Sequence, residues 1–227
     1  VYDESNSLKR VSYDWVVKHI AELETLTYAS VAPNAEQDAI LKLADQSGMP
    51  VRRVEVQPEQ FGIQCAYREY RNLGIDRWLA VLAAEHLYPH NDIVIVDAGT
   101  AMTVDALTNH KQHLGGWIMP GLSLMQDAIV SRAPGVFTDK DIQFQNFGAS
   151  TPNALYSGCV NALLGSIERA QCLLLKTKGT AENTEKVDIM VILTGGDAEL
   201  LAQHLELATI VEPNLVFVGL QRFAKDK

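Results

Sequence analysis

The stretch from Ile93 to Asp105 constrains this chain most, because it joins a buried strand to a polar turn. Ile93–Val96 is a run of four β-branched apolar residues, which is typical of a strand buried on both faces. The run leads into Asp97, Gly99 and Thr100, so a carboxylate, a glycine and a hydroxyl meet solvent at the strand end. Such a turn can bind a cation and a phosphate, since glycine lets backbone amides approach a ligand closely. It can equally be an ordinary tight turn, and these residues alone leave both interpretations open.

Composition describes a globular chain without the charge pattern of a nucleic-acid-binding protein. The 227 residues are 47% hydrophobic and 21% charged, which fits one large domain or two smaller ones. The formal net charge is -9 and no Lys or Arg cluster is visible, so no nucleic-acid partner is expected. No apolar run approaches the roughly 20 residues of a bilayer span, so we expect no membrane partner and a cytoplasmic location. The cysteines lie far apart without a CxxC spacing, which predicts reduced structural thiols at Cys65, Cys159 and Cys172.

The first part of the chain alternates strands and helices, which predicts a mixed or parallel sheet with helices on it. We expect strands at 1–2, 8–13, 25–32 and 51–56, and helices at 14–20, 35–46 and 74–86. The helix at 35–46 has its apolar residues on one face and ends before Gly48. A polar linker at 88–92 is the best domain boundary, so we predict domains at 1–90 and 91–227.

The second part begins with a strand meander. We expect strands at 93–96, 103–107, 113–118, 188–193 and 209–211, and helices at 122–132, 152–175, from 198 and from 215. A Walker P-loop and a Rossmann fingerprint both need a helix directly after the glycine turn, so both are excluded here. Both parts place strands first and then alternate helices with strands, which predicts two similar α/β domains with a cleft between them.

Three glycine-bearing segments lie beside expected strand ends in the second part. They are Asp97–Thr100, Gly115–Gly116 and Thr194–Ala198, and we expect them to line one edge of one sheet. Nucleotide sites use such an edge, because backbone amides bind phosphate oxygens and a carboxylate handles the cation. Each segment alone is compatible with an ordinary turn, and residues 115–121 are alternatively a strand with a bulge.

An acid and a base adjoin where the helix at 74–86 begins. Asp76 is suited to accept a hydroxyl proton, and Arg77 to hold a carboxylate bidentately. A charge at a helix terminus would also explain Asp76, and exposed Asp–Arg pairs usually have no role. His110 and His113 have a spacing that could suggest a metal, but with no cysteine or further histidine nearby we expect a surface position.

Four motifs, taken together and in this order, resemble those of the type III pantothenate kinase family. They are Gly74–Arg77, Asp97–Asp105, Gly115–Gly121 and Thr194–Ala198. The family belongs to the actin-like kinase superfamily, so the resemblance implies two duplicated ribonuclease-H-like domains with a central cleft. It also implies transfer of the ATP γ-phosphoryl group to pantothenate, which yields 4'-phosphopantothenate in the first step of coenzyme A biosynthesis.

The resemblance also implies roles for individual residues. Asp76 would be the general base, and pantothenate would bind around it, at Tyr67, Gly74, Ile75, Asp76, Arg77 and Thr151. ATP, with magnesium, would bind at the glycine turns, at Gly99, Thr100, Gly195 and Gly196. Asp97 would hold the monovalent cation, potassium or ammonium, that the family uses. Family members are homodimers with substrate sites at the dimer interface, which implies a homodimer here.

One family motif, an Asp-x-Gly-Asn-Thr/Ser phosphate loop, does not occur in these residues. We expect its place just ahead of Val1, so the first domain would lack its N-terminal strand in this chain. Two alternatives remain open. One is a non-catalytic accessory or regulatory protein on the same fold, and the other is a different small-molecule kinase of the superfamily, such as a sugar kinase. The Gly74–Arg77 motif weighs against the sugar kinase.

Overall fold

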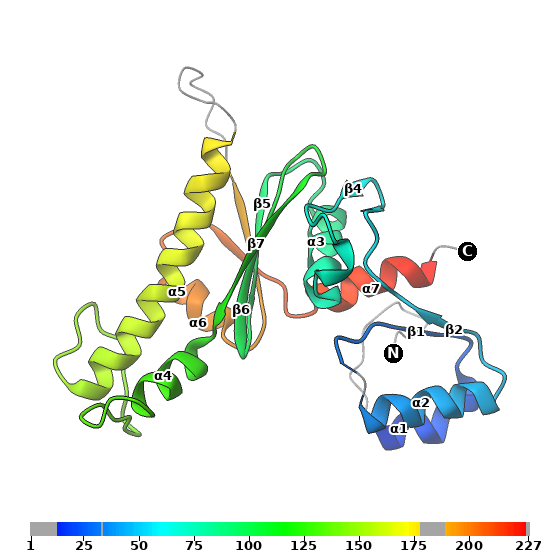
Figure 1. The fold of residues 1–227 in the computed structure, drawn as a ribbon, viewed down its shortest axis with the longest axis horizontal. Helices are drawn as coiled ribbons and strands as arrows, with labels where there is room; N and C mark the ends of the chain where they lie inside the picture. The colour runs from blue at the N-terminus through cyan, green and yellow to red at the C-terminus, as the bar shows by residue number, and fades with distance from the viewer. Residues whose placement is uncertain (1–12, 33, 178–188, 226–227) are drawn as a thin grey trace.

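A five-stranded sheet with helices on both faces forms the body of the protein (Figure 1). The computed structural model describes residues 13–32, 34–177 and 189–225. In spatial order the strands are β7 (His113–Pro120), β6 (Ala101–Leu107), β5 (Ile93–Ala98), β8 (Met190–Thr194) and β9 (Thr209–Val211). The meander β5–β6–β7 is antiparallel, whereas β8 and β9 extend the sheet from β5 in parallel. The predicted mixed α/β class with a central sheet is therefore confirmed.

The central strand β5 is buried on both faces, as its apolar run predicts. Val94 and Val96 pack against helices on one face, whereas Ile93 and Ile95 pack against helices on the other. None of these side chains is more than 2% exposed. Both faces of this strand are covered, which fits its apolar side chains from Ile93 to Val96. Asp97, its first polar residue, lies near the carboxyl end of the strand, which we call the sheet edge.

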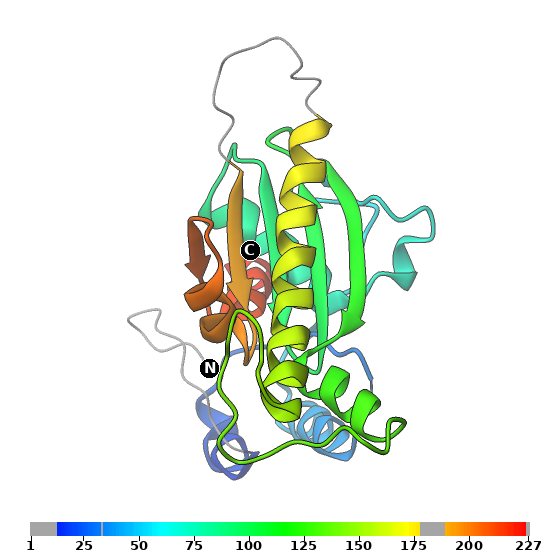
Figure 2. The ribbon, with the colours of Figure 1, turned by 90° about the vertical axis from the view of Figure 1, so that its left-hand side faces the viewer.

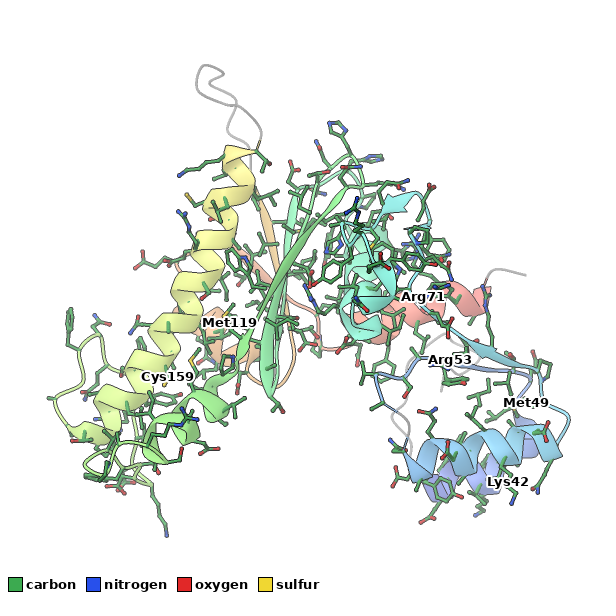
Figure 3. The ribbon with its side chains drawn as sticks, in the orientation of Figure 1. Lys42, Met49, Arg53, Arg71, Met119 and Cys159 are labelled. Atoms are coloured by element: carbon green, nitrogen blue, oxygen red, sulfur yellow. The ribbon has the colours of Figure 1, made fainter. Side chains whose placement is uncertain are left out.

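One face of the sheet is covered by α4 (Leu122–Val130), α5 (Thr151–Lys176) and α6 (Ala198–His204). The long helix α5 runs across this face in Figure 2. Figure 3 labels Cys159 on α5 and Met119 on β7, which both belong to the core on this side. The helix begins where the sequence predicts, because Ser150 accepts a hydrogen bond from the backbone N–H of Asn153 and a proline follows in the first turn.

The opposite face is covered by α3 (Ile75–Leu87), and α7 (Leu215–Lys225) packs on α3. The helix α3 is apolar nearly all round, and Trp78, Val81 and Leu82 are fully buried. A Cβ atom at Gly219 of α7 would overlap the backbone carbonyl of Leu79, so α3 and α7 meet backbone to backbone. Since α3 shares one core with β5 and β8, the predicted boundary at residue 90 falls between two packed elements.

A smaller group of elements, blue in Figure 1, lies beside this body. In it β1 (Leu26–Tyr28) and β2 (Val51–Arg53) pair in parallel around the connecting helix α2 (Ala35–Gln46). Asn34 caps α2 by accepting a 2.8 Å hydrogen bond from the backbone N–H of Gln37. This group also contains α1 (Tyr13–His19) and η1 (Ile20–Glu22). The short elements β3 (Glu59–Gln60), β4 (Ile63–Gln64) and η2 (Tyr70–Asn72) lie by α3 instead, where Ile63 and Tyr70 join its core.

Most predicted elements occur, but the strands of the first part are shorter than expected. The strands expected at 25–32 and 51–56 have three residues each, and in the described part of the chain they pair only with each other. The strands expected at 1–2 and 8–12 lie outside the described residues, and Tyr13 begins α1 instead of ending a strand. The helix expected at 122–132 ends at Val130. The strand expected at 188–193 is β8, which begins at Met190 and ends at Thr194, and Asp188 lies outside the described residues.

The thiols behave as structural groups. All three cysteines are free, with Cys159 buried and Cys65 and Cys172 half-buried. Burial raises the pKa of Cys65 and of Cys159, so both thiols stay protonated at neutral pH. Separately, no helix in the described parts of the chain has both the length and the apolar character needed to cross a membrane.

Candidate active site

Two of the three predicted glycine segments lie side by side at the carboxyl end of β5. Strand register causes this, since Asp97 pairs with Thr194 across the parallel β5–β8 ladder. The backbone N–H of Asp197 then donates to the carbonyl of Ala98 at 3.0 Å. From the end of β7, the N–H of Gly121 donates to the carbonyl of Thr100 at 2.9 Å. Three chain turns therefore meet at one sheet edge.

Glycine is required at this edge by close backbone contact. Gly195 has a φ of +93°, which favours glycine in any surroundings. A Cβ atom there would also lie 2.5 Å from Oδ1 of Asp97 and 2.6 Å from the carbonyl of Ala98. Gly196, in contrast, has open space around its Cβ position. Gly195 thus allows the second turn to close over the Asp97 carboxylate.

The third segment, Gly115–Gly116, does not lie at this edge. It lies inside β7, where Gly116 pairs with Asp105 beside an irregularity in the β6–β7 register. The expectation of three turns at one edge is therefore wrong for this segment, and the alternative of a strand with a bulge is correct. A Cβ atom at Gly116 would lie 2.6 Å from Oδ1 of Asp105 and 2.8 Å from Nη2 of Arg77. The same Cβ atom would overlap the backbone carbonyl of Val104, so this glycine makes room both for the neighbouring strand and for the ion pair.

Asp76 and Asp97 lie within electrostatic reach of each other. Two effects raise the pKa of the Asp97 carboxyl above its usual range: burial is the larger, and the negative charge of Asp76 is the smaller. Asp76 is exposed in the first turn of α3, and its Oδ1 accepts a 2.9 Å hydrogen bond from the backbone N–H of Arg77. A Cβ atom at Gly74 would lie 2.5 Å from that oxygen, so Gly74 leaves room for the carboxylate. The charge of Asp76, the predicted general base, therefore acts on Asp97, the predicted cation ligand.

Arg77 holds a carboxylate bidentately, but the carboxylate belongs to Asp105. Its Nε donates to Oδ2 of Asp105 at 2.9 Å and its Nη2 donates to Oδ1 at 2.7 Å. Its Nη1 donates to the hydroxyl oxygen of Tyr67 at 3.0 Å. Burial would lower the pKa of Arg77, but the hydrogen bonds to Asp105 and its negative charge outweigh burial and raise it. The guanidinium is therefore charged, paired and only 5% exposed.

His113 completes this polar group, and the expectation of a surface position is wrong for it. Its ring is buried, and Nε2 lies 2.9 Å from Oδ1 of Asp105. Its Nδ1 accepts a 3.4 Å hydrogen bond from the backbone N–H of Ala66, so the hydrogen on Nε2 is donated to Asp105. His110 is exposed, as expected. Neither Asp105 nor His113 was among the predicted site residues.

Thr151 is the predicted site residue that lies apart from the others. It is exposed at the start of α5, on the sheet face opposite to α3, as Figure 1 shows for the two helices. Tyr67, Gly74, Ile75, Asp76 and Arg77 lie at or near the start of α3. The predicted ATP residues Gly99, Thr100, Gly195 and Gly196 lie at the sheet edge. In the described residues no three His, Cys, Asp or Glu side chains cluster as metal ligands, so the cation prediction rests on Asp97.

Backbone turns and carboxylates gathered at one sheet edge suit a phosphotransferase, which needs amides near phosphate oxygens and an acid near the accepting hydroxyl. A family model described as type III pantothenate kinase matches residues 3–171. A type III pantothenate kinase of Pseudoalteromonas translucida is 39% identical over 194 residues, covering 85% of this chain and 78% of the relative. Another, of Colwellia psychrerythraea, is 36% identical over 226 residues, covering 94% and 87%. The chain belongs to the type III pantothenate kinase family, which confirms the resemblance carried by the four motifs.

A solved structure from Campylobacter jejuni has the same fold. It is described as a Baf family transcriptional activator, and it aligns with a TM-score of 0.55 at 23% identity. The alignment covers 92% of this chain and 87% of that one. At this level of identity the likeness concerns the fold alone.

Proposed function

We propose that the protein phosphorylates pantothenate with ATP, forming 4'-phosphopantothenate in the first step of coenzyme A biosynthesis. Family membership supports this reaction, since relatives 39% and 36% identical to the chain are type III pantothenate kinases. The structural observation that carries the proposal is the meeting of the Asp97 and Thr194 turns at one sheet edge. The charge of Asp76, at the start of α3, also acts on Asp97 there.

Asp76 is the proposed general base. Its carboxylate is exposed at the start of α3, so a substrate hydroxyl can approach it and transfer a proton. Phosphoryl transfer depends mainly on positioning the reactants and on neutralising the phosphate charge, and it also uses a base near the accepting hydroxyl. Gly74 and Ile75 lie at the start of the same helix, and Arg77 next to Asp76 is hydrogen-bonded to Tyr67. These residues are the proposed pantothenate site.

Gly99, Thr100, Gly195 and Gly196 are the proposed contacts of ATP, which supplies the phosphoryl group and carries magnesium. Asp97 is the proposed ligand of potassium or ammonium. The fit is electrostatic, because a half-buried carboxylate repelled by Asp76 is stabilised by a nearby cation. An ATP-consuming enzyme of coenzyme A synthesis works where ATP is abundant, so a cytoplasmic location remains our prediction.

The proposed active unit is a homodimer in which Thr151 reaches the pantothenate site of the other copy. Support comes from the sheet, which separates α5 from α3 within one chain. Exposed apolar side chains also lie near Thr151 in sequence and on the edge strand β7. Phe147 is 94% exposed and Ile118 is 67% exposed, which favours a covered surface in the assembly.

A mixing experiment tests this arrangement. Asp76→Asn and Thr151→Ala each weaken every site of their own dimers. In a mixed dimer with shared sites, one site carries both changes and the other carries none. Activity at low pantothenate should therefore exceed that of either variant alone. Activity equal to the average of the two would contradict shared sites.

The two halves are further proposed to be duplicated ribonuclease-H-like domains, divided at residue 90. The order α1–β1–α2–β2–α3 recurs as α5–β8–α6–β9–α7, and each series contains a parallel strand pair around its middle helix. The last helices of the two series, α3 and α7, pack against each other.

Turnover decides between the kinase and its alternatives. The purified protein with ATP, magnesium and potassium should release ADP when pantothenate is added, and should stop when magnesium is chelated. No pantothenate-dependent ADP release with potassium or ammonium present would contradict the proposal. A non-catalytic regulator would bind without turnover, whereas another small-molecule kinase would release ADP with a different acceptor, such as a sugar.

A further inference from the structure

A closed ring of polar contacts lies behind the proposed pantothenate site. Asp105 on β6 binds Arg77 on α3 through bonds of 2.7 and 2.9 Å, and Arg77 donates to the hydroxyl of Tyr67 at 3.0 Å. On its other side Asp105 accepts from Nε2 of His113 at 2.9 Å, and His113 accepts from the N–H of Ala66 at 3.4 Å. Ala66 precedes Tyr67, so the ring returns to the tyrosine that it supports. Tyr67 is thereby fixed both at its hydroxyl and through its backbone.

The charged and polar members of this ring of contacts are buried, although apolar side chains would lose less hydration free energy in their place. Asp105 is 2% exposed, His113 3% and Arg77 5%. Burying an ion pair often contributes no net stability compared with apolar residues of similar size, because both charges lose their hydration. A Cβ atom at Gly116 would press on this pair as well as on the backbone carbonyl of Val104. A buried polar group with full hydrogen bonding instead fixes one orientation of its members.

The direction of the hydrogen bonds leaves the Tyr67 hydroxyl as a donor towards a ligand. Because Nη1 of Arg77 donates to the hydroxyl oxygen, the hydrogen of that hydroxyl is free to be donated elsewhere. The positive charge behind it makes the hydroxyl a stronger donor. The ring of Tyr67 is also fixed, because it stacks on His113 at 6.5 Å between centroids and lies 5.8 Å from Cζ of Arg77. Tyr67 is half-buried, so its hydroxyl can meet a ligand.

We propose that Asp105 and His113 are positioning residues for pantothenate: they fix Arg77 so that the Tyr67 hydroxyl is presented as a donor to an oxygen acceptor of the substrate. Neither residue touches the substrate. This inference rests on the proposed kinase function and assigns the recognition of one substrate oxygen to Tyr67. Asp105 also occupies the Nε and Nη2 donors of Arg77, so that the site presents the oriented Tyr67 hydroxyl in place of a free guanidinium.

Steady-state kinetics of Asp105→Asn and His113→Leu test the proposal. Each change should raise the KM for pantothenate about tenfold, the effect expected for one lost oriented hydrogen bond, with kcat and the KM for ATP within about threefold. His113→Gln keeps an N–H donor of similar reach and should restore most of the pantothenate affinity. Asp92→Asn is the matched control, because Asp92 is also a buried carboxylate, 5% exposed, that accepts a backbone N–H at 2.9 Å away from the site. It should leave both KM values unchanged.

A double-mutant cycle with Tyr67→Phe separates positioning from general destabilisation. If Asp105 acts through the tyrosine hydroxyl, Asp105→Asn should raise the pantothenate KM less than threefold in the Tyr67→Phe background. A full tenfold increase in that background, or equal increases in the KM for pantothenate and ATP, would overturn the proposal. If Asp105→Asn does not fold, the same cycle is run with His113→Leu. Wild-type turnover in the same assay keeps a failure of the kinase function distinct from a failure of this inference.

Discussion

Asp97 lies one residue before the end of the central strand, and its pKa is raised by burial and by the charge of Asp76 at the start of α3. Two carboxylates in such a position disfavour each other's ionised form. Ionised Asp97 is therefore unfavourable beside Asp76 in the protein alone, and a cation bound next to Asp97 would make it favourable. This relationship makes stability, cation binding and catalysis measurable at the same pair of residues.

The first prediction concerns the stability of Asp97→Asn. A carboxyl whose pKa is raised by folding stabilises the folded state below its unfolded pKa, and this stabilisation is lost as pH rises through the folded pKa. At pH 7 the ionised Asp97 therefore costs stability, and Asp97→Asn should raise Tm in buffer without potassium. The gain should shrink as pH falls towards 4. Added potassium should raise the Tm of the wild type but not of the variant, and an equal shift in both would contradict a cation at Asp97.

The second prediction concerns Asp76→Asn, which keeps an oxygen that can accept the N–H of Arg77. If Asp76 is the general base, kcat should fall by about 10²- to 10⁴-fold. The free energy of unfolding should change by no more than about 0.5 kcal/mol, because the side chain is exposed. Asp38→Asn is the control, since Asp38 is an exposed acid in the first turn of α2. Turnover of Asp76→Asn within tenfold of wild type would exclude the assigned role.

The third prediction concerns Gly195→Ala at the sheet edge. The alanine would have to adopt the positive φ of Gly195, and its Cβ atom would press on Asp97 and the carbonyl of Ala98. The variant should therefore lose about 1–3 kcal/mol of stability. The KM for ATP should rise as well, because the turn must move away from β5. Gly165→Ala in α5 has open space and should gain about 0.5–1 kcal/mol. Equal stability changes in the two variants would show that the close approach at Gly195 has no consequence.

The sequence was most informative where one residue pattern determines one environment. The apolar run at 93–96 predicts a strand covered on both faces, and the structure shows it at the centre of the sheet. The α2 prediction is correct at both ends, because Asn34 caps the helix and Gly48 follows it. The Asp97 and Thr194 turns meet because both follow parallel neighbouring strands, whose carboxyl ends share one edge.

The sequence was least informative where contacts depend on how separate elements are placed. Asp105, Arg77 and His113 meet only after α3 lies on the face of β6 and the β6–β7 register is fixed. One signal was present, because Asp105 lies in an otherwise apolar half of its strand, where a buried charge requires a partner. The partner itself could not be read from spacing. The proposed role of Thr151 could not be derived from spacing either, since in the proposed homodimer it depends on a second copy of the chain.

The last prediction concerns Gly219→Ala, at the closest contact between α3 and α7. Alanine normally stabilises a helix compared with glycine, so propensity alone predicts a gain of about 1 kcal/mol. Here the Cβ atom would overlap the backbone carbonyl of Leu79, which cannot rotate away as a side chain would. The helices must separate, and we expect a net loss of about 1–3 kcal/mol, measured by urea unfolding. Gly158→Ala in α5, with nothing within 4 Å of its Cβ position, should show the gain instead. A gain at both positions would mean that α3 and α7 are not in backbone contact at Gly219.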